Sequence, residues 1–287
     1  SLHDALPIYV ISPTWFSISS NDGDISSLAS SDYVDTAHQN DMEVWGLMDN
    51  FSTDIDTDTV LGTTTSRENL EGQLITEALN YQLDGINIDI ESLPEETSES
   101  YVQFMRELSV KCRNNNLVLS VDVPPPYSFN EHYSQKELGE VVDYVIIMGY
   151  DEHYVGSDAG SVASLPWVEQ GVKDTLSEVA AQRTILAIPF YTRLWTGSGD
   201  NASSRAMGIS EATKWVSESG MDLTWDDSVG QYYGRLDSQN GEQQLWMEET
   251  RSLGLKMDLI KKYDLAGVAG WRLGLETSDV WDVIGWE

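Results

Sequence analysis

Short β-branched or apolar runs alternate with longer amphipathic segments along the chain from Tyr9 onward. This order is typical of βα units around a parallel sheet. The candidate strands are Val10–Thr14, Glu43–Met48, Gly85–Ile90, Leu117–Val123, Tyr144–Gly149, Thr184–Pro189 and Gly267–Trp271. Candidate helices, with apolar residues at three- and four-residue steps, include Ser66–Tyr81, Ser98–Asn114 and Leu165–Ala181. The count is one strand short of an eight-stranded barrel, so we predict an α/β fold, a (β/α)8 TIM barrel over residues 9–287 that lacks its first strand.

Two segments depart from this alternation. Residues 196–248 carry Gly, Ser and Asp clusters around short aromatic runs, and we expect a small α+β insertion there before the last strand, with a partly mobile surface excursion as the alternative. Residues 1–8 resemble translated adapter sequence and are predicted to be a non-native leader.

Composition excludes several functions. The 287 residues include 48 acidic and 16 basic side chains, a formal net charge of -32, so nucleic acid and anionic membranes are poor partners. A hydrophobic content of 40% with ten Trp indicates a large core. The single cysteine, Cys112, allows no internal disulfide and no thiolate zinc cluster. No stretch reaches the ~20 apolar residues of a membrane span.

The segment Asp84–Glu91 reads Asp-Gly-Ile-Asn-Ile-Asp-Ile-Glu. In a strand its three isoleucines would point one way, and Asn87, Asp89 and Glu91 the other. An edge strand with a solvated face would give the same alternation. However, two acids about 7 Å apart with no cation nearby in sequence favour a coupled pair at the barrel mouth, in which one carboxyl holds a proton for general acid catalysis.

The placement of both acids on one strand constrains the reaction. An ordinary retaining glycosidase holds its two carboxyls about 5 Å apart on opposite faces of the sugar, and an inverting enzyme holds them farther apart. Asp89 and Glu91 would approach the sugar from one side. They suit a reaction whose nucleophile belongs to the substrate, the 2-acetamido oxygen of an N-acetylhexosamine.

At this point the sequence resembles the family 18 glycoside hydrolases, whose signature is the Asp-Gly-x-(Asp/Asn)-x-Asp-x-Glu strand at Asp84–Glu91. It is most similar to the spore-cortex and peptidoglycan branch, the YaaH/SleL-like N-acetylglucosaminidases. Four further segments carry the resemblance in order along the chain: Ile11–Phe16, Met148–His153, Ile188–Tyr191 and Ala266–Trp271.

The resemblance implies roles for several residues. Glu91 would be the acid/base, Asp89 would orient the acetamido group as an oxazolinium ion forms, and Tyr150 would hydrogen-bond the acetamido oxygen. Trp271 would lie beneath the sugar at the cleavage site. Asn87 stands where many chitinases have Asp, and we expect it to leave Asp89 less opposed by negative charge.

Other residues are candidates for substrate binding. Met148 and Tyr150 share a strand face, and Asp151 begins the next loop. Tyr191 and Trp195, with Trp15, are candidate sugar contacts. Asp122 shares a face with Ser120 and is expected beside the acid pair, or else to cap a loop. Arg193 could pair with substrate or neutralise an acid, and His153 is read as loop structure or subsite lining because no second histidine lies at ligand spacing.

We therefore expect a retaining hydrolase of β-1,4 bonds after N-acetylglucosamine, acting without metal or organic cofactor. Peptidoglycan is the first expected substrate and chitin oligosaccharides the second. The alternative is a family 18-like lectin without catalysis. The resemblance further implies an extracellular, cell-wall or spore location. We also expect a monomer that does not insert into membranes.

Overall fold

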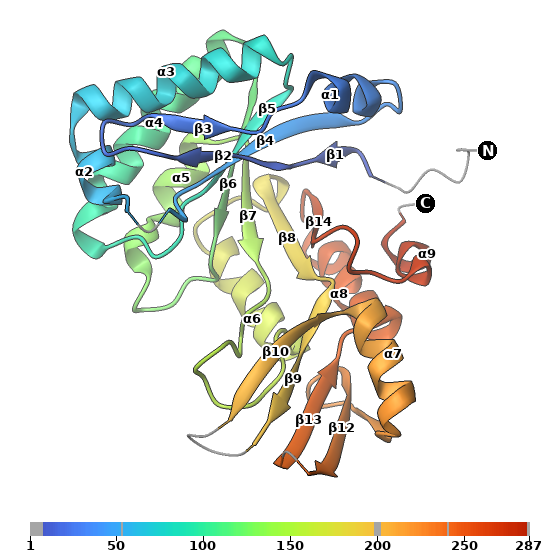
Figure 1. Cartoon of the computed structure of the whole chain (residues 1–287). Helices are drawn as coiled ribbons and strands as arrows, with labels where there is room; N and C mark the ends of the chain where they lie inside the picture. Colours follow the sequence, from blue (N-terminus) through green and yellow to red (C-terminus); the bar gives the residue numbers. More distant parts are fainter. Residues whose placement is uncertain (1–7, 53, 198–201, 240, 286–287) are drawn as a thin grey trace. The chain divides into compact units, whose positions relative to one another are not determined.

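The computed structural model describes residues 8–52, 54–197, 202–239 and 241–285. The predicted leader therefore falls almost entirely outside the described residues. The chain divides into two compact units, the first formed by residues 1–146 and 177–184 and the second by residues 147–176 and 185–287 (Figure 1).

The first unit is built on a mostly parallel sheet. Strands β2, β4, β5 and β6 lie side by side in that order and run parallel, β1 also pairs with β4, and β3 is antiparallel to β2. The strands are β1 (Val10–Ile11), β2 (Thr14–Ile18), β3 (Ile25–Ser27), β4 (Glu43–Asp49), β5 (Gly85–Asp89) and β6 (Val118–Val123), and β7 (Tyr144–Met148) begins in this unit.

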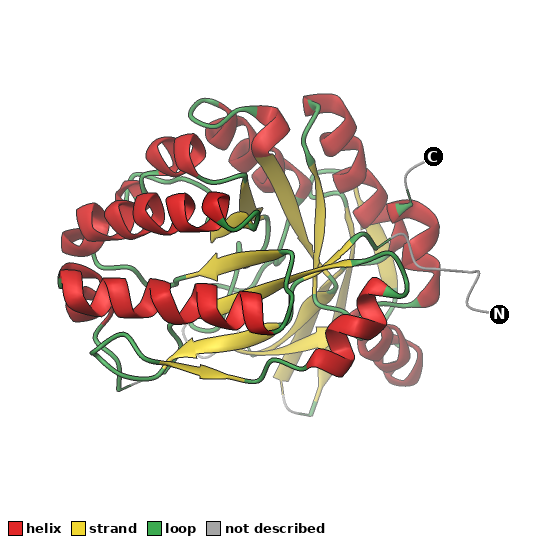
Figure 2. Cartoon of the chain, turned by 90° about the horizontal axis from the view of Figure 1, so that it is seen from above, coloured by secondary structure: helices red, strands yellow, loops and turns green. Residues whose placement is uncertain are grey.

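Helices cover the strands of the first unit (Figure 2). They are α1 (Ser31–His38), α2 (Thr57–Gly62), α3 (Thr64–Asn80), α4 (Ser98–Asn114) and α5 (Gln135–Val141), with 3-10 turns η1 (Glu95–Thr97), η2 (Glu131–Tyr133) and η3 (Ala181–Arg183). Leu70 and Leu74 of α3 and Phe104 and Leu108 of α4 have no exposed surface. This apolar stripe at three- and four-residue steps is the reason that these segments are helical and packed.

The second unit combines a parallel pair with an antiparallel sheet. Strand β8 (Thr184–Pro189) pairs in parallel with β14 (Gly267–Trp271). The antiparallel sheet has the order β10-β9-β13-β12-β11. Its strands are β9 (Tyr191–Thr196), β10 (Ser203–Gly208), β11 (Leu223–Asp226), β12 (Gln231–Ser238) and β13 (Gly241–Met247). The helical segments are α6 (Leu165–Leu176), α7 (Ile209–Ser219), α8 (Thr250–Tyr263), η5 (Ser278–Val280) and α9 (Trp281–Ile284).

The sequence-based elements are confirmed in outline, with three corrections. The predicted strand Val10–Thr14 is two strands, because Pro13 has no N–H to donate to a ladder. The predicted helix from Leu165 ends at Leu176, and η3 follows separately. The insertion is an α+β segment as expected, but its antiparallel sheet begins at Tyr191, earlier than residue 196, because β9 supplies its first strand. Closure of a barrel, and the expected absence of its first strand, stay predictions.

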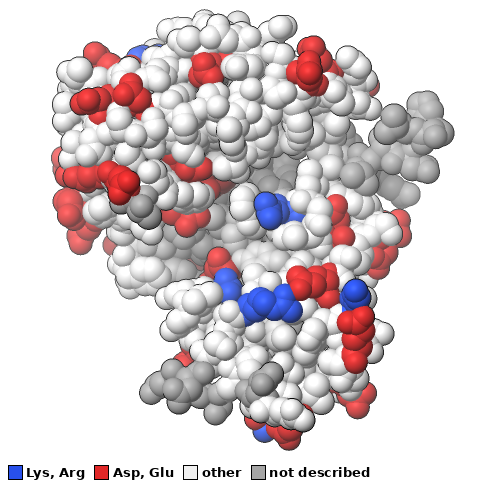
Figure 3. All heavy atoms as spheres, viewed as in Figure 1, with Lys and Arg blue, Asp and Glu red and all other residues white. Residues whose placement is uncertain are grey.

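Acidic side chains are scattered over the visible face of the molecule and greatly outnumber basic ones (Figure 3). Among the helices of the described ranges, none combines the length and apolar character needed to cross a bilayer.

Candidate active site

Strand β5 presents the signature residues at its carboxyl end. The alternation is as predicted, with Ile86, Ile88 and Ile90 at most 1% exposed. Both β5 faces are nevertheless buried, since Asn87 and Asp89 are 2% and 5% exposed. An edge strand with a solvated face is therefore excluded for β5, which lies between β4 and β6. The strand ends at Asp89, and Glu91 follows two residues later with an exposed side chain.

Asn87 connects β5 to β6 through its side-chain amide. Its Nδ2 donates to Oδ2 of Asp122 at 2.8 Å, and its Oδ1 accepts from Oγ of Ser120 at 2.7 Å. Asp122 thus lies beside the acid pair, which was one of the two positions predicted for it. The buried Asn87 amide thus hydrogen-bonds both Asp122 and Ser120, and it fixes the orientation of the Asp122 carboxyl.

Two of the acids, Asp89 and Asp122, have raised pKa values. Burial, followed by the negative charges of Asp122, Glu91 and Asp49, raises the pKa of Asp89 to about 8. Desolvation raises the pKa of Asp122 to about 7, against the hydrogen bond from Asn87, which lowers it. Oδ1 of Asp89 is buried and has no hydrogen-bond partner. An unpartnered buried carboxyl oxygen among other acids is a strong candidate for substrate contact, because it is costly unless a ligand satisfies it.

Asn87 is not among the residues whose charge raises the pKa of Asp89, and the expectation that it leaves Asp89 less opposed by negative charge stays a prediction. Asp122 is the largest charged contributor to the raised pKa of Asp89. Asp122 stands on β6, which pairs in parallel with β5.

Sequence reasoning missed three further residues around the acids. Asp49 ends β4, pairs in register with Asp89 and is 3% exposed. Tyr133 accepts a hydrogen bond from the Leu93 N–H at 3.2 Å, and its ring lies edge-on to the fully buried Tyr101. One signal could have revealed Asp49: β4, β5 and β6 each carry an aspartate at or next to the carboxyl end, and these ends meet at one sheet edge.

A second group of predicted residues lies in the second unit. The Tyr191 hydroxyl donates to Oδ1 of Asp151 at 2.6 Å, and the Tyr150 and Tyr191 rings meet edge to face with centroids 6.2 Å apart. Burial, then the Asp151 charge, raises the pKa of Tyr191, so its hydroxyl stays protonated. Arg193 approaches the same Asp151 oxygen at 3.9 Å. This contact agrees with neutralisation of an acid, and pairing of Arg193 with substrate stays a prediction.

The remaining predicted aromatic residues have different environments. Trp271 is 37% exposed at the end of β14, and the bond to Arg272 is cis. Trp195 is only 1% exposed, and its indole N–H donates to the Gly160 carbonyl at 2.9 Å. Trp195 therefore offers no ring face to a sugar and is a packing residue of the antiparallel sheet. Trp15 packs edge-on against Tyr33 in the first unit.

Three other predicted residues also have defined positions. Met148 is half-buried at the end of β7. His153 contacts the Asp158 carbonyl through Nδ1 at 2.9 Å and belongs to a loop, as expected. Cys112 is buried in α4, as a structural cysteine should be. No group of three or more His, Cys, Asp or Glu side chains among the described residues is arranged to hold a metal ion.

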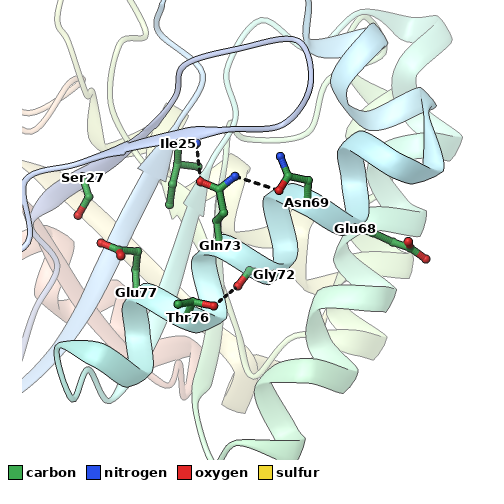
Figure 4. Close-up of a pocket in the computed structure, with 8 residues that line it drawn as sticks. All are labelled: Ile25, Ser27, Glu68, Asn69, Gly72, Gln73, Thr76 and Glu77. Atoms are coloured by element: carbon green, nitrogen blue, oxygen red, sulfur yellow. Dashed lines mark hydrogen bonds between the residues drawn. The ribbon is translucent and has the colours of Figure 1, made fainter.

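A pocket of about 380 Å³ lies between β3 and α3, away from these acids in the first unit (Figure 4). Gln73 spans it, accepting from the Ile25 N–H at 3.2 Å and donating to Oδ1 of Asn69 at 3.0 Å. The two acids in its lining, Glu68 and Glu77, stand nine residues apart on α3 and lie at opposite ends of the labelled set in Figure 4.

Comparison with known proteins gives a consistent result. Residues 45–276 match the family model described as glycosyl hydrolases family 18. The chain is 25% identical over 261 residues to the uncharacterized glycosylase YvbX of Bacillus subtilis (strain 168), covering 86% of this chain and 76% of that protein. It is also 25% identical over 231 residues to the cortical fragment-lytic enzyme of the same organism, covering 77% of this chain but only 54% of that longer protein.

A solved structure agrees over almost the full length. The crystal structure of a chitinase from Chromobacterium violaceum superposes with a TM-score of 0.90 at 21% identity, covering 98% of this chain and 92% of the other. At this identity the likeness concerns the fold.

Proposed function

Because this chain belongs to glycosyl hydrolases family 18, we propose that it hydrolyses β-1,4 bonds after N-acetylglucosamine, with retention of configuration. The observation that carries the proposal is the acid cluster at the end of β5, where the buried Asp89 has a raised pKa and an oxygen without a hydrogen-bond partner.

In the first step, Glu91 donates its proton to the glycosidic oxygen while the bond from that oxygen to C1 breaks. The acetamido oxygen of the same sugar bonds to C1, which gives an oxazolinium ion and leaves Glu91 as a carboxylate. Asp89 accepts a hydrogen bond from the acetamido N–H, and its ionised form stabilises the positive charge of the oxazolinium ion. Two displacements at C1 give net retention.

In the second step, Glu91 takes a proton from a water molecule, whose oxygen attacks C1 and opens the oxazolinium ring. This returns the proton to Glu91 and completes the hydrolysis. Asn87 and Asp122 support the step because protons shared within the cluster limit the repulsion among its carboxylates. Tyr150 enters this proposal through the sequence resemblance, as the hydrogen-bond donor to the acetamido oxygen.

We further propose peptidoglycan as the first substrate and chitin oligosaccharides as the second. The relative named as a cortical fragment-lytic enzyme supports the former and the chitinase fold supports the latter. A spore or cell-wall location follows from the same relatives. Trp271, with about a third of its surface exposed, is the proposed platform for the sugar ring.

The test is hydrolysis of a fluorogenic chitobioside and of purified peptidoglycan by wild type and by Glu91→Gln. We expect the variant to lose at least about 100-fold in kcat and to retain affinity for N-acetylglucosamine oligomers. If the folded wild type binds these oligomers but hydrolyses neither substrate, the lectin alternative replaces the proposed enzymatic function.

A further inference from the structure

Asn50 directly follows β4 and holds the backbone of Glu91 from both sides. Its Oδ1 accepts from the Glu91 N–H at 3.0 Å, and its Nδ2 donates to the Glu91 carbonyl oxygen at 3.0 Å. The β4–β5 ladder ends where Asp49 pairs with Asp89. The Asn50 amide therefore continues, by side chain, the hydrogen bonding that the strands no longer supply at Glu91.

Asn50 is itself fixed. The second hydrogen of its Nδ2 donates to Oγ1 of Thr57, at the start of α2, at 3.0 Å. The amide thus uses both of its hydrogens, and its oxygen accepts from Glu91. A side chain held at three points has few alternative rotamers, so it is a rigid support for the segment it binds.

The chain beyond Glu91 is restrained as well. Ser92 has a left-handed φ of 52°, and the Leu93 N–H donates to the hydroxyl of Tyr133, which is 6% exposed. Asn50 on one side and Tyr133 on the other therefore fix residues 91 to 93, although Glu91 itself carries an exposed side chain outside any strand.

We propose that Asn50 is a positioning residue for the reaction, which aims the Glu91 carboxyl by clamping both backbone polar groups of that residue. The inference rests on the proposed function, since it assigns Glu91 the role of acid/base. A shift of about 1 Å in a reacting group can cost on the order of 100-fold in rate, so a side chain that touches no substrate can control kcat.

The position of the Glu91 side chain can also be followed without an enzymatic assay, through the pKa values of its neighbours. Its negative charge contributes to the raised pKa values of Asp89 and Asp122. If the clamp is removed and Glu91 moves away, these two carboxyls lose a neighbouring charge. Their titration midpoints, followed by carbon NMR of labelled aspartates, should then fall toward the ordinary value.

The experiment compares the full chain as wild type, Asn50→Ala and Asn50→Asp. We expect Asn50→Ala to lower kcat on the chitobioside by about 10- to 100-fold and to leave KM within about twofold. Asn50→Asp keeps an acceptor for the Glu91 N–H but cannot donate to its carbonyl, so its kcat should be intermediate.

Asn69→Ala is the matched control. Asn69 is also half-buried in the first unit and also makes three hydrogen bonds, with Asp22, Asp24 and Gln73. We expect it to lower the melting temperature about as much as Asn50→Ala while kcat and the aspartate midpoints stay at the wild-type values.

The outcomes separate the two proposals. An Asn50→Ala variant with wild-type kcat, or with unmoved midpoints for Asp89 and Asp122, overturns the positioning role. If the wild type hydrolyses neither substrate, the proposed function fails on its own, and the NMR titration still decides whether Asn50 positions Glu91.

Discussion

At the scale of single residues, Asp89 links stability to pH. Its folded-state pKa is about 8, whereas an unfolded aspartate has a pKa of about 3.9. Between these values the folded state binds more protons than the unfolded state, so the free energy of unfolding falls as pH rises from about 4 to about 8. The cost is absent below about pH 4 and is fully present above about pH 8.

Asp89→Asn should stabilise the fold at alkaline pH, because it removes the cost of ionising Asp89. It should also abolish hydrolysis, because Asp89 is proposed to stabilise the oxazolinium ion. We expect its free energy of unfolding to exceed that of wild type at pH 8 by on the order of a few kcal/mol, with little difference at pH 4. Urea denaturation at the two pH values measures this. Asp24→Asn is the control of opposite sign, because hydrogen bonds from Asn69, Ser20 and Gln73 lower the pKa of Asp24. Equal effects of Asp89→Asn at both pH values would contradict the argument.

Asn87 and Asp89 could be predicted from sequence because strand alternation puts them on one face of β5, and Glu91 follows just beyond the end of that strand. The role of Asn50 could not be predicted from sequence, because its contact with Glu91 spans 41 residues and depends on the register between β4 and β5. The burial of Trp195 could not be predicted from sequence either, since a high aromatic content does not indicate which rings are buried and which are exposed.

At the scale of elements, a buried ion pair in the second unit links α8 to Glu248, which directly follows β13. Lys256 of α8 donates to Oε1 of Glu248 at 2.8 Å, and both side chains are 0% exposed. Gln231 of β12 and Ser252 of α8 also donate to the Glu248 carboxylate. The pair therefore anchors the antiparallel sheet to the helix that leads into β14.

Replacement of one partner should lower the free energy of unfolding much more than replacement of both partners. Lys256→Met leaves a buried carboxylate unpaired, and we expect a loss of about 3–5 kcal/mol in the free energy of unfolding. The double variant Lys256→Met/Glu248→Gln leaves no buried charge and keeps one side-chain oxygen as an acceptor for Gln231, so it should recover most of that loss. Chemical denaturation of both variants gives the comparison. A double variant that is no more stable than Lys256→Met would contradict this account of the pair.

Element positions were the most predictable part of the fold. Helix α4 has the predicted bounds of Ser98–Asn114, because its apolar stripe is long and regular. The antiparallel sheet of the second unit could be expected only as an insertion. Its strand order depends on pairings such as Gln243 with Thr196, which no local pattern encodes.

At the scale of the whole molecule, the net charge of -32 affects the encounter with substrate. Acidic groups are spread over the visible face and do not form one patch (Figure 3), so they act as a long-range field. Peptidoglycan carries carboxylates, whereas an N-acetylglucosamine oligomer is neutral. Like charges slow association, and salt screens this repulsion as the Debye length shrinks from about 30 Å at 0.01 M to about 8 Å at 0.15 M.

We therefore expect kcat/KM on soluble peptidoglycan fragments to rise about threefold to tenfold when NaCl increases from about 10 to about 150 mM. The value on a neutral chitooligosaccharide should stay constant, because no charged substrate is repelled. Parallel assays on the two substrates across the salt series measure the effect, and the neutral substrate controls for salt effects on the fold. A rate on peptidoglycan that falls with salt would mean that a local basic region attracts the glycan and outweighs the acidic surface.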